Sequence, residues 1–392
     1  MPAFQPEPLL QILHYSDIHL AVQGSMYKRW QTSRMPLSFR QGLAGARRAL
    51  LHEFIHLIRD LSSGDNDWKN HPIWLVDTGD GTTFGETDAL REWDDWTRKF
   101  EQATPGAQLL RVYGNHDAWP QGHPLKMAHA PWQMDTQRDI LRNTHFPQTW
   151  PTAPLSIPIP NTSCHIELCL VNTVDHRLWP NVFALGIAAR DRDWTHFQKI
   201  PRPTPANDLA DRARKNGAAV HRDLRIAAMH YPVADDATLG NPSLQKVLKN
   251  RKRFAKELRQ HPIAQPLITH LLLAGHTHEV FPKLGQLPAT ATVACHAPLT
   301  NGQCQIVTGS LSQEALPRTA LPAAANLHDK MMHSNPYQCT LLRFFIQANS
   351  PYELLMDRAT IAADDSGIFS YLPTHHSPQG YTTPFERMKI VL

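Results

Sequence analysis

The sequence predicts an α/β fold with parallel strands, and three observations lead to that prediction. Short apolar runs alternate with amphipathic helical segments over the first 115 residues, an order typical of strands that lie parallel in one sheet with helices packed on it. Polar clusters stand directly after the apolar runs, and the carboxyl ends of parallel strands are where such sheets collect ligands. Hydrophobic residues make up 42% of the 392 residues, which is enough for a buried core.

The first third of the chain predicts the order strand, helix, strand, helix, strand. Residues 9–15 are a short apolar run bounded by a turn, which is typical of a buried strand. Apolar residues then recur at spacings of three and four over residues 43–61, which predicts an amphipathic helix. Residues 72–76 and 109–113 predict two further strands, and residues 86–100 predict a helix between them.

The rest of the chain is less regular. Residues 118–160 are rich in Pro, Trp, His and Gln and lack periodicity, so we expect a long loop over the site. Its Trp side chains could line a substrate lid, but we favour the interpretation that they pack the loop onto the core. Further strands are predicted at residues 166–174, 182–187, 224–229, 268–274, 304–307, 339–345 and 352–356. Helical stretches are predicted at 191–216 and 244–258, and we interpret the second, a basic one, as a solvated face rather than a nucleic-acid contact. We expect a core over residues 1–280 and a β-rich extension over residues 281–392.

Composition limits the class of protein. The formal net charge of +4 is only mildly basic, so it does not by itself imply a nucleic-acid partner. The five cysteines are odd in number and form no C-x-x-C pair, so we expect neither a disulfide framework nor a cysteine-ligated zinc site. No apolar run approaches the roughly 18 residues that a membrane span needs. No basic region followed by an apolar stretch opens the chain, so we expect a cytoplasmic protein without a membrane partner.

Five short polar motifs follow predicted strands. In chain order they are D-x-H at 17–19, G-D at 79–80, G-N-H-D at 114–117, H-x-P at 230–232 and G-H-x-H at 275–278. Asp oxygens and His nitrogens are ligands of Zn²⁺, Mn²⁺ and iron. We expect the side chains of each D-x-H or H-x-H pair to point to the same side of an extended backbone. The glycines that precede ligand positions allow close approach of the backbone.

The charges of these residues suit a phosphate ester. Two divalent ions bring four positive charges, while the carboxylates of Asp17 and Asp80 and one hydroxide remove three. The residual positive charge attracts an anionic ester, and two metals roughly 3.5–4 Å apart can clamp the attacking and leaving oxygens of an in-line displacement.

Taken in order, the five motifs resemble those of the calcineurin-like metallophosphoesterase superfamily, and the resemblance runs from residue 12 to residue 278. It implies an α/β fold of two packed mixed β-sheets flanked by helices, a four-layer αββα sandwich with a dinuclear metal site at the sheet edge. The strands after residue 280 would complete the second sheet. The cofactors implied are two divalent metal ions, drawn from Mn, Fe and Zn.

The resemblance also implies a role for each matching residue. The implied ligands of the first metal are Asp17, His19 and His278, those of the second are Asn115, His230 and His276, and Asp80 bridges both. His116 would protonate the leaving oxygen or stabilise the transition state, Asp117 would orient His116, and a hydroxide bridging the metals would be the nucleophile. One position departs from the family, which often reads G-D-x-x-D or G-D-x-x-N, because Thr83 stands where the second polar residue is usual.

We therefore expect a metal-dependent phosphoesterase that acts on a small-molecule phosphoester. A small phosphodiester such as a cyclic nucleotide is the leading substrate, by resemblance to compact bacterial members of the superfamily. A phosphomonoesterase, a DNA-processing nuclease and a non-catalytic interaction protein on the same fold are the alternatives. Nothing after residue 280 is strongly basic, so no nucleic-acid partner is expected. The sequence leaves the oligomeric state open.

Overall fold

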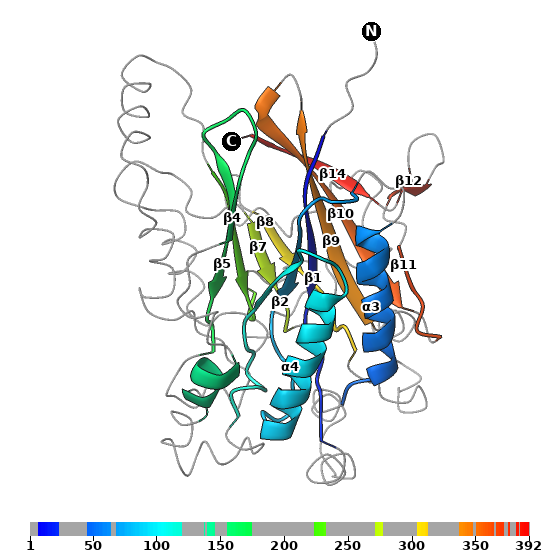
Figure 1. Ribbon diagram of the computed structural model, residues 1–392, viewed down its shortest axis with the longest axis vertical. Helices are drawn as coiled ribbons and strands as arrows, with labels where there is room; N and C mark the ends of the chain where they lie inside the picture. Colours follow the sequence, from blue (N-terminus) through cyan, green and yellow to red (C-terminus); the bar gives the residue numbers. More distant parts are fainter. Residues whose placement is uncertain are drawn as a thin grey trace, which may run out of the picture.

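The protein is described from a computed structural model, in which two β-sheets lie face to face with two helices on one side (Figure 1). The described residues are 7–22, 45–63, 68–119, 137, 139–145, 155–174, 223–232, 271–276, 304–312, 337–347, 350–363, 366–371, 375–376, 382–383 and 385–391. The strand predicted at 182–187 and the helical stretches predicted at 191–216 and 244–258 lie outside these residues.

The first sheet has seven strands, in the order β11-β10-β9-β1-β2-β3 with β14 paired to β10. Its strands are β1 (Glu7–Tyr15), β2 (Ile73–Asp77), β3 (Gln108–Arg111), β9 (Tyr337–Gln347), β10 (Ser350–Ala363), β11 (Phe369–Tyr371) and β14 (Glu386–Val391). The pairs β1–β2 and β2–β3 are parallel, which confirms the layout predicted for the first third of the chain. The pair β1–β9 is antiparallel, so the sheet is mixed.

The second sheet has five strands in the order β4-β5-β6-β7-β8. They are β4 (Leu155–Pro158), β5 (His165–Val171), β6 (Leu224–Met229), β7 (Leu271–Ala274) and β8 (Cys304–Val307). All neighbours are parallel except β4 and β5, which are antiparallel. A separate two-stranded ribbon joins β12 (His375–His376) to β13 (Thr382–Thr383).

Residues 118–160, predicted as a long loop over the site, contain two short elements. Strand β4 and the π-helical turn η2 (Leu141–His145) lie within this segment. Strand β4 has only four residues, sits at the sheet edge and ends in Pro158, so it lacks the long apolar run by which buried strands are recognised. Most of the remaining residues of this segment lie outside the described part of the chain.

Two amphipathic helices cover the first sheet, α3 (Arg48–Ser62) and α4 (Thr87–Gln102) (Figure 1). Helix α3 buries the apolar residues that recur every three or four positions, as predicted from their spacing. Aromatic contacts join the helices to β1, because the ring of Tyr15 lies 5.1 Å from that of Phe54 and 5.8 Å from that of Phe100, centroid to centroid. Among the described helices, none combines the length and apolar character needed to cross a bilayer.

An apolar core fills the space between the two sheets. It takes side chains from both, for example Ile12 and Val76 from the first sheet and Ile226 and Leu273 from the second, all of them buried. Along a strand of the first sheet, successive side chains point to opposite faces, so alternate residues face the helices or the second sheet. Two packed mixed sheets with flanking helices confirm the predicted fold class.

The strands after residue 280 are divided between the two sheets. We expected them to complete the second sheet, and β8 does so. Strands β9, β10, β11 and β14 instead extend the first sheet, because β9 pairs along the edge of β1 that β2 leaves open and buries Phe344 between the sheets. The division of the chain at residue 280 stays a prediction.

Candidate metal centre

Loops from both sheets meet at one edge of the molecule, where parallel strands of each sheet end. The backbone N–H of Asp17, after β1, donates to the carbonyl of Gly79, after β2, at 2.9 Å. The N–H of His19 donates to the carbonyl of Asp80 at 3.0 Å, and in the second sheet the N–H of Gly275 donates to the carbonyl of His230 at 3.1 Å. These bonds join the loops within each sheet, and the N–H of His276, which donates to Oδ2 of Asp17 at 3.0 Å, joins the loops of the two sheets.

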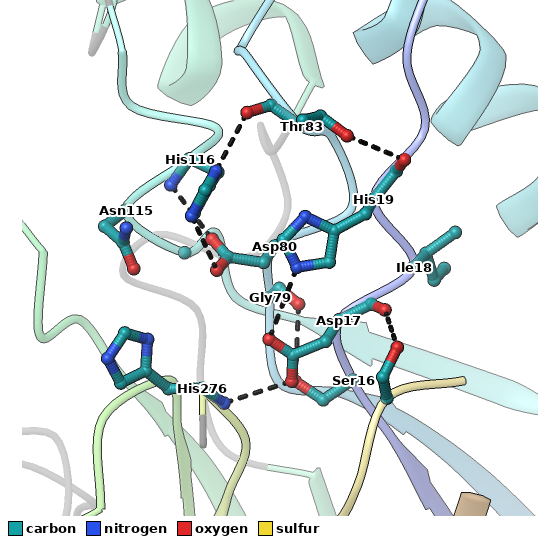
Figure 2. A network of polar contacts seen from close by, with 12 residues as sticks. Ser16, Asp17, Ile18, His19, Gly79, Asp80, Thr83, Asn115, His116 and His276 are labelled. Carbon is teal, nitrogen blue, oxygen red and sulfur yellow. Dashed lines mark hydrogen bonds and ion pairs between the residues drawn. The ribbon is translucent and has the colours of Figure 1, made fainter. Parts of the chain in front are cut away.

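Two groups of potential ligands lie side by side there and have Asp80 in common. The first group is Asp17, His19 and Asp80, and the second is Asp80, His230 and His276. Within each group, one ligand atom of each residue lies within 4.8 Å of the others. The side chains of Asp17, Asp80 and His276 face a common space in Figure 2.

Asn115 joins the second group through its side-chain oxygen. That Oδ1 lies 3.0 Å from Nε2 of His230, and the same nitrogen lies 3.2 Å from Nδ1 of His276 and 3.2 Å from Oδ2 of Asp80. The structure therefore gathers six of the seven predicted ligands around two adjacent positions. His278 lies outside the described residues.

The donor set fits a cation at the second position. Nδ1 of His230 lies 2.8 Å from the carbonyl oxygen of Thr78, which can only accept, so Nδ1 carries a proton and Nε2 faces the ligand group. Burial lowers the pKa of His230, but the Asp80 carboxylate outweighs burial and raises the pKa to about 9. The electrostatic environment thus favours positive charge on this nitrogen. A proton there can satisfy only one of the three surrounding acceptors, whereas a divalent ion can bind all of them in place of the proton.

Asp80 is held as a carboxylate. Burial raises the pKa of its carboxyl, but the neighbouring His230 and His116 lower it by more, so that the pKa lies below its ordinary value. An ionised carboxylate common to both groups is the form that binds two cations.

The backbone at the ligands is strained. Four ligands lie in the left-handed region, which residues other than glycine rarely adopt. Their φ angles are 57° at Asp17, 59° at His19, 54° at Asp80 and 69° at His276. Each such residue costs on the order of 1 kcal/mol and persists where surrounding structure enforces it, commonly at functional sites. The expectation of an extended D-x-H backbone was wrong, although Nε2 of His19 does lie 3.8 Å from Oδ1 of Asp17.

Two glycines permit the close approach of the loops. A Cβ on Gly114 would lie 2.0 Å from Oδ1 of Asp80, and a Cβ on Gly275 would lie 1.8 Å from Oγ of Ser16. Any side chain at these positions would displace the ligand loops, as the sequence predicted from the placement of the glycines.

His116 borders the ligand groups without belonging to either (Figure 2). Its backbone N–H donates to Oδ1 of Asp80 at 2.9 Å, and its Nε2 lies 4.0 Å from Oδ2 of the same residue. Its Nδ1 lies 2.8 Å from the carbonyl oxygen of Thr83, and its ring packs on Trp119 with centroids 4.1 Å apart. Trp119 is buried against this ring, while Trp132 and Trp150 of the same segment lie outside the described residues.

The role expected for Asp117 was wrong, because its carboxylate does not orient the His116 ring. Oδ1 of Asp117 accepts from the N–H and the hydroxyl of Thr82, each at 2.8 Å, and Oδ2 accepts from the N–H of Gly114 at 2.8 Å. Asp117 therefore ties the loop after β2 to the loop after β3. Adjacency to His116 in the sequence gave no information on the direction of this side chain.

Sequence reasoning missed the serines that follow β8. Oγ of Ser310 donates to the carbonyl of Asp17 at 2.7 Å, and Oγ of Ser312 donates to the carbonyl of Ile18 at 2.9 Å. Both are buried and hold the first ligand loop in its strained conformation. The signal was available, since these residues also come directly after a predicted strand.

Residues 10–280 match the model of the calcineurin-like phosphoesterase family. The chain belongs to this family. The match covers well over half of the chain and includes all five motifs. No curated protein sequence matches the chain.

Several solved phosphatase structures are similar to this calcineurin-like phosphoesterase. A purple acid phosphatase from yellow lupin (Lupinus luteus) seeds is 11% identical, with a TM-score of 0.40 over 93% of this chain, and the chain spans 55% of that protein. A cold-active protein-tyrosine phosphatase of a Shewanella species is 12% identical, with a TM-score of 0.28 over 94% of this chain and 83% of that chain.

Membership of the family establishes the chemistry at a coarse level. The protein is a metal-dependent phosphoesterase, a hydrolase of phosphoric esters, and the family implies a dinuclear site for divalent metals. The two ligand groups that share Asp80 are where the described residues fit such a site.

Proposed function

We propose that this phosphoesterase hydrolyses a small phosphodiester, with a cyclic nucleotide as the leading candidate. In this proposal Asp17, His19 and His278 hold one metal, Asn115, His230 and His276 hold the other, and Asp80 bridges them. The metals are two of Mn, Fe and Zn, whose preferences for mixed nitrogen and oxygen ligands fit this set.

The observation that carries the proposal is the shared carboxylate beside a histidine. Asp80 belongs to both ligand groups, and Nε2 of His116 lies 4.0 Å from its Oδ2. A group that can donate a proton therefore borders the place where an ester oxygen would be bound. The His116 side chain is 11% exposed, whereas the Asp80 side chain is 1% exposed, which leaves His116 the more accessible of the two.

Two bound divalent ions would supply Lewis acidity and an orienting clamp for the phosphoryl oxygens. The residues of the chain supply the rest. Asp80 fixes the backbone of His116 through the 2.9 Å bond to its N–H. The P–O bond to the leaving group breaks as a hydroxide oxygen bonds to phosphorus, and the leaving oxygen takes a proton from Nε2 of His116. General acid catalysis of this kind contributes about 10²–10⁴-fold to the rate.

The charge of the site suits an anionic phosphoester. Two divalent cations against the carboxylates of Asp17 and Asp80 leave two positive charges, and the hydroxide needed for hydrolysis leaves one. A phosphodiester carries one negative charge and balances it. A fully ionised phosphomonoester carries two, and the proton that His116 holds for the leaving oxygen balances the second. The preference for a diester therefore rests on the resemblance to compact bacterial members of the superfamily.

A panel of esters tests the proposal. Protein of measured metal content is assayed with bis(p-nitrophenyl) phosphate, p-nitrophenyl phosphate, 3′,5′-cyclic AMP, 3′,5′-cyclic GMP and linear duplex DNA. We expect kcat/KM for the diesters to exceed that for the monoester, and His116→Asn to lower kcat by about 10²-fold or more with metal content unchanged.

The other outcomes select among the alternatives. Preference for the monoester would assign a phosphomonoesterase, and cleavage of DNA alone would assign a nuclease. Protein that binds metal but hydrolyses no substrate in the panel would indicate a non-catalytic protein.

We also retain a cytoplasmic location as a prediction, and the free thiols of Cys164, Cys169 and Cys339 suit a reducing compartment.

A further inference from the structure

We infer that Thr83 is the positioning residue for His116. The inference rests on the proposed catalytic role of His116. It concerns the position at which the sequence departs from the G-D-x-x-D pattern, where Thr83 leaves no acidic side chain three residues after Asp80.

Thr83 contacts the site with two different groups, as Figure 2 shows. Its hydroxyl donates to the carbonyl of His19 at 2.8 Å, and its own carbonyl oxygen lies 2.8 Å from Nδ1 of His116. The residue is fully buried, so water does not compete for either bond. Thr83 therefore links the backbone of one predicted ligand to the ring of the predicted acid.

The carbonyl of Thr83 sets the tautomer of His116. A carbonyl oxygen only accepts, so Nδ1 carries the proton of this bond. The exchangeable proton is then confined to Nε2, the nitrogen 4.0 Å from Oδ2 of Asp80. Trp119 on one side of the ring, with centroids 4.1 Å apart, and the edge contact with His19 at 5.0 Å restrict the ring to this orientation.

The hydroxyl of Thr83 sets the direction of that carbonyl. The loop after β2 is bonded to the loop after β1 by the N–H of Leu20, which donates to Gly81 at 2.8 Å, and by the N–H of Thr83, which donates to Leu20 at 2.7 Å. The hydroxyl bond to the carbonyl of His19 adds a third contact between the two loops. Without it, the peptide group of Thr83 loses one of its restraints, and its carbonyl is held less firmly towards Nδ1 of His116.

Substitutions of the hydroxyl test the inference. Thr83→Val keeps the shape of the side chain and removes the donor, Thr83→Cys keeps a group of similar size that donates weakly, and Thr83→Ser restores the donor. Thr162→Val is the matched control, because the hydroxyl of Thr162 also donates to a backbone carbonyl at 2.8 Å, that of Ile159, away from the site.

Two readouts are taken on full-length protein loaded with Zn²⁺, the diamagnetic metal among those that fit the site. The first is kcat and KM with bis(p-nitrophenyl) phosphate, together with metal content. The second is the ¹⁵N–¹H spectrum of the histidine rings at fixed pH, in which the signal missing from His116→Asn identifies His116. The second readout needs no turnover, so it decides the inference even if the proposed function fails.

We expect Thr83→Val and Thr83→Cys to lower kcat by about 10-fold, as loss of an outer hydrogen bond to a catalytic group commonly does, with KM and metal content unchanged. The Nδ1–H signal of His116 should shift or broaden in both variants, while Thr83→Ser and Thr162→Val match the wild type. An unchanged His116 signal in Thr83→Val and Thr83→Cys would overturn the inference, whatever happens to kcat. Loss of metal in these variants would also overturn it, since Thr83 would then support the ligand His19 rather than His116.

Discussion

Gly114 is the position where the smallest change should have the largest effect on turnover. A Cβ at this position would lie 2.0 Å from Oδ1 and 2.5 Å from the backbone nitrogen of Asp80. Real Cβ contacts do not fall below 3.0 Å, so Gly114→Ala must move the Asp80 carboxylate by about 1 Å.

The size of the effect follows from that displacement. A misplacement of about 1 Å at a reacting centre costs about 10²-fold in rate, and overpacking of a buried site costs about 1–3 kcal/mol of stability. We therefore expect kcat of Gly114→Ala to fall by about 10²-fold, while the protein remains folded at 25 °C. The assay is steady-state hydrolysis of a chromogenic phosphodiester at saturating metal, with the free energy of unfolding measured in urea.

Gly106→Ala is the control for this experiment. Gly106 is exposed, has a φ of +77° and has nothing within 4 Å of a Cβ, so the substitution costs about 1 kcal/mol of backbone strain and moves no ligand. We expect lower stability with unchanged kcat. If Gly114→Ala kept kcat within about 3-fold of the wild type while losing stability, the close approach of the two loops would not be what positions Asp80 for the reaction.

Two further predictions concern stability and metal affinity. Burial raises the pKa of Asp77 to about 8, so the folded state keeps a proton that the unfolded state loses near pH 4. The free energy of unfolding should therefore fall by at most about 1.4 kcal/mol per pH unit between about pH 4 and pH 8. Urea titrations at pH 5 and pH 8 should show a smaller fall in Asp77→Asn than in the wild type. An equal fall in both proteins would mean that Asp77 is ionised in the folded state. Ser310→Ala removes the 2.7 Å bond to the carbonyl of Asp17, so it should weaken the binding of Mn²⁺ by about 10-fold in a metal titration. An unchanged dissociation constant would show that this bond does not support the first ligand group.

The parts of the fold that could be predicted from sequence are those fixed by local pattern. The buried strands β6 and β8 begin and end where their apolar runs do, and helix α3 follows the spacing of its apolar residues. Pairing is not a local property, so the edge of β1 taken by β9 could not be predicted. Strand β10 extends well past the predicted residues 352–356, because it pairs with β9 as far as Ala363. The partner of Asp357 in its interior, Arg387 of β14 at 2.6 Å, is likewise indicated by no local pattern.

The candidate site shows the same division. Residue types at strand ends predicted which side chains meet, since six of the seven expected ligands surround two adjacent positions. The direction of a polar side chain depends on partners far along the chain, and this is where the predictions failed. Asp117 turns to Thr82 instead of His116, and Thr83 contacts His116 through a backbone carbonyl, which has no signature in the sequence.

The account depends on Asp80 being bound by two cations at once. The most direct test is the number of metal ions per chain in the wild type and in Asp80→Asn. Each protein is loaded with Mn²⁺, passed through gel filtration and analysed by inductively coupled plasma mass spectrometry. Asparagine tolerates the left-handed φ of 54° and retains one oxygen for the N–H of His116, so the fold should survive the change. We predict two ions per chain in the wild type and at most one in the variant, with turnover abolished. A wild type that binds a single ion, or an Asp80→Asn protein that retains two, would contradict the account.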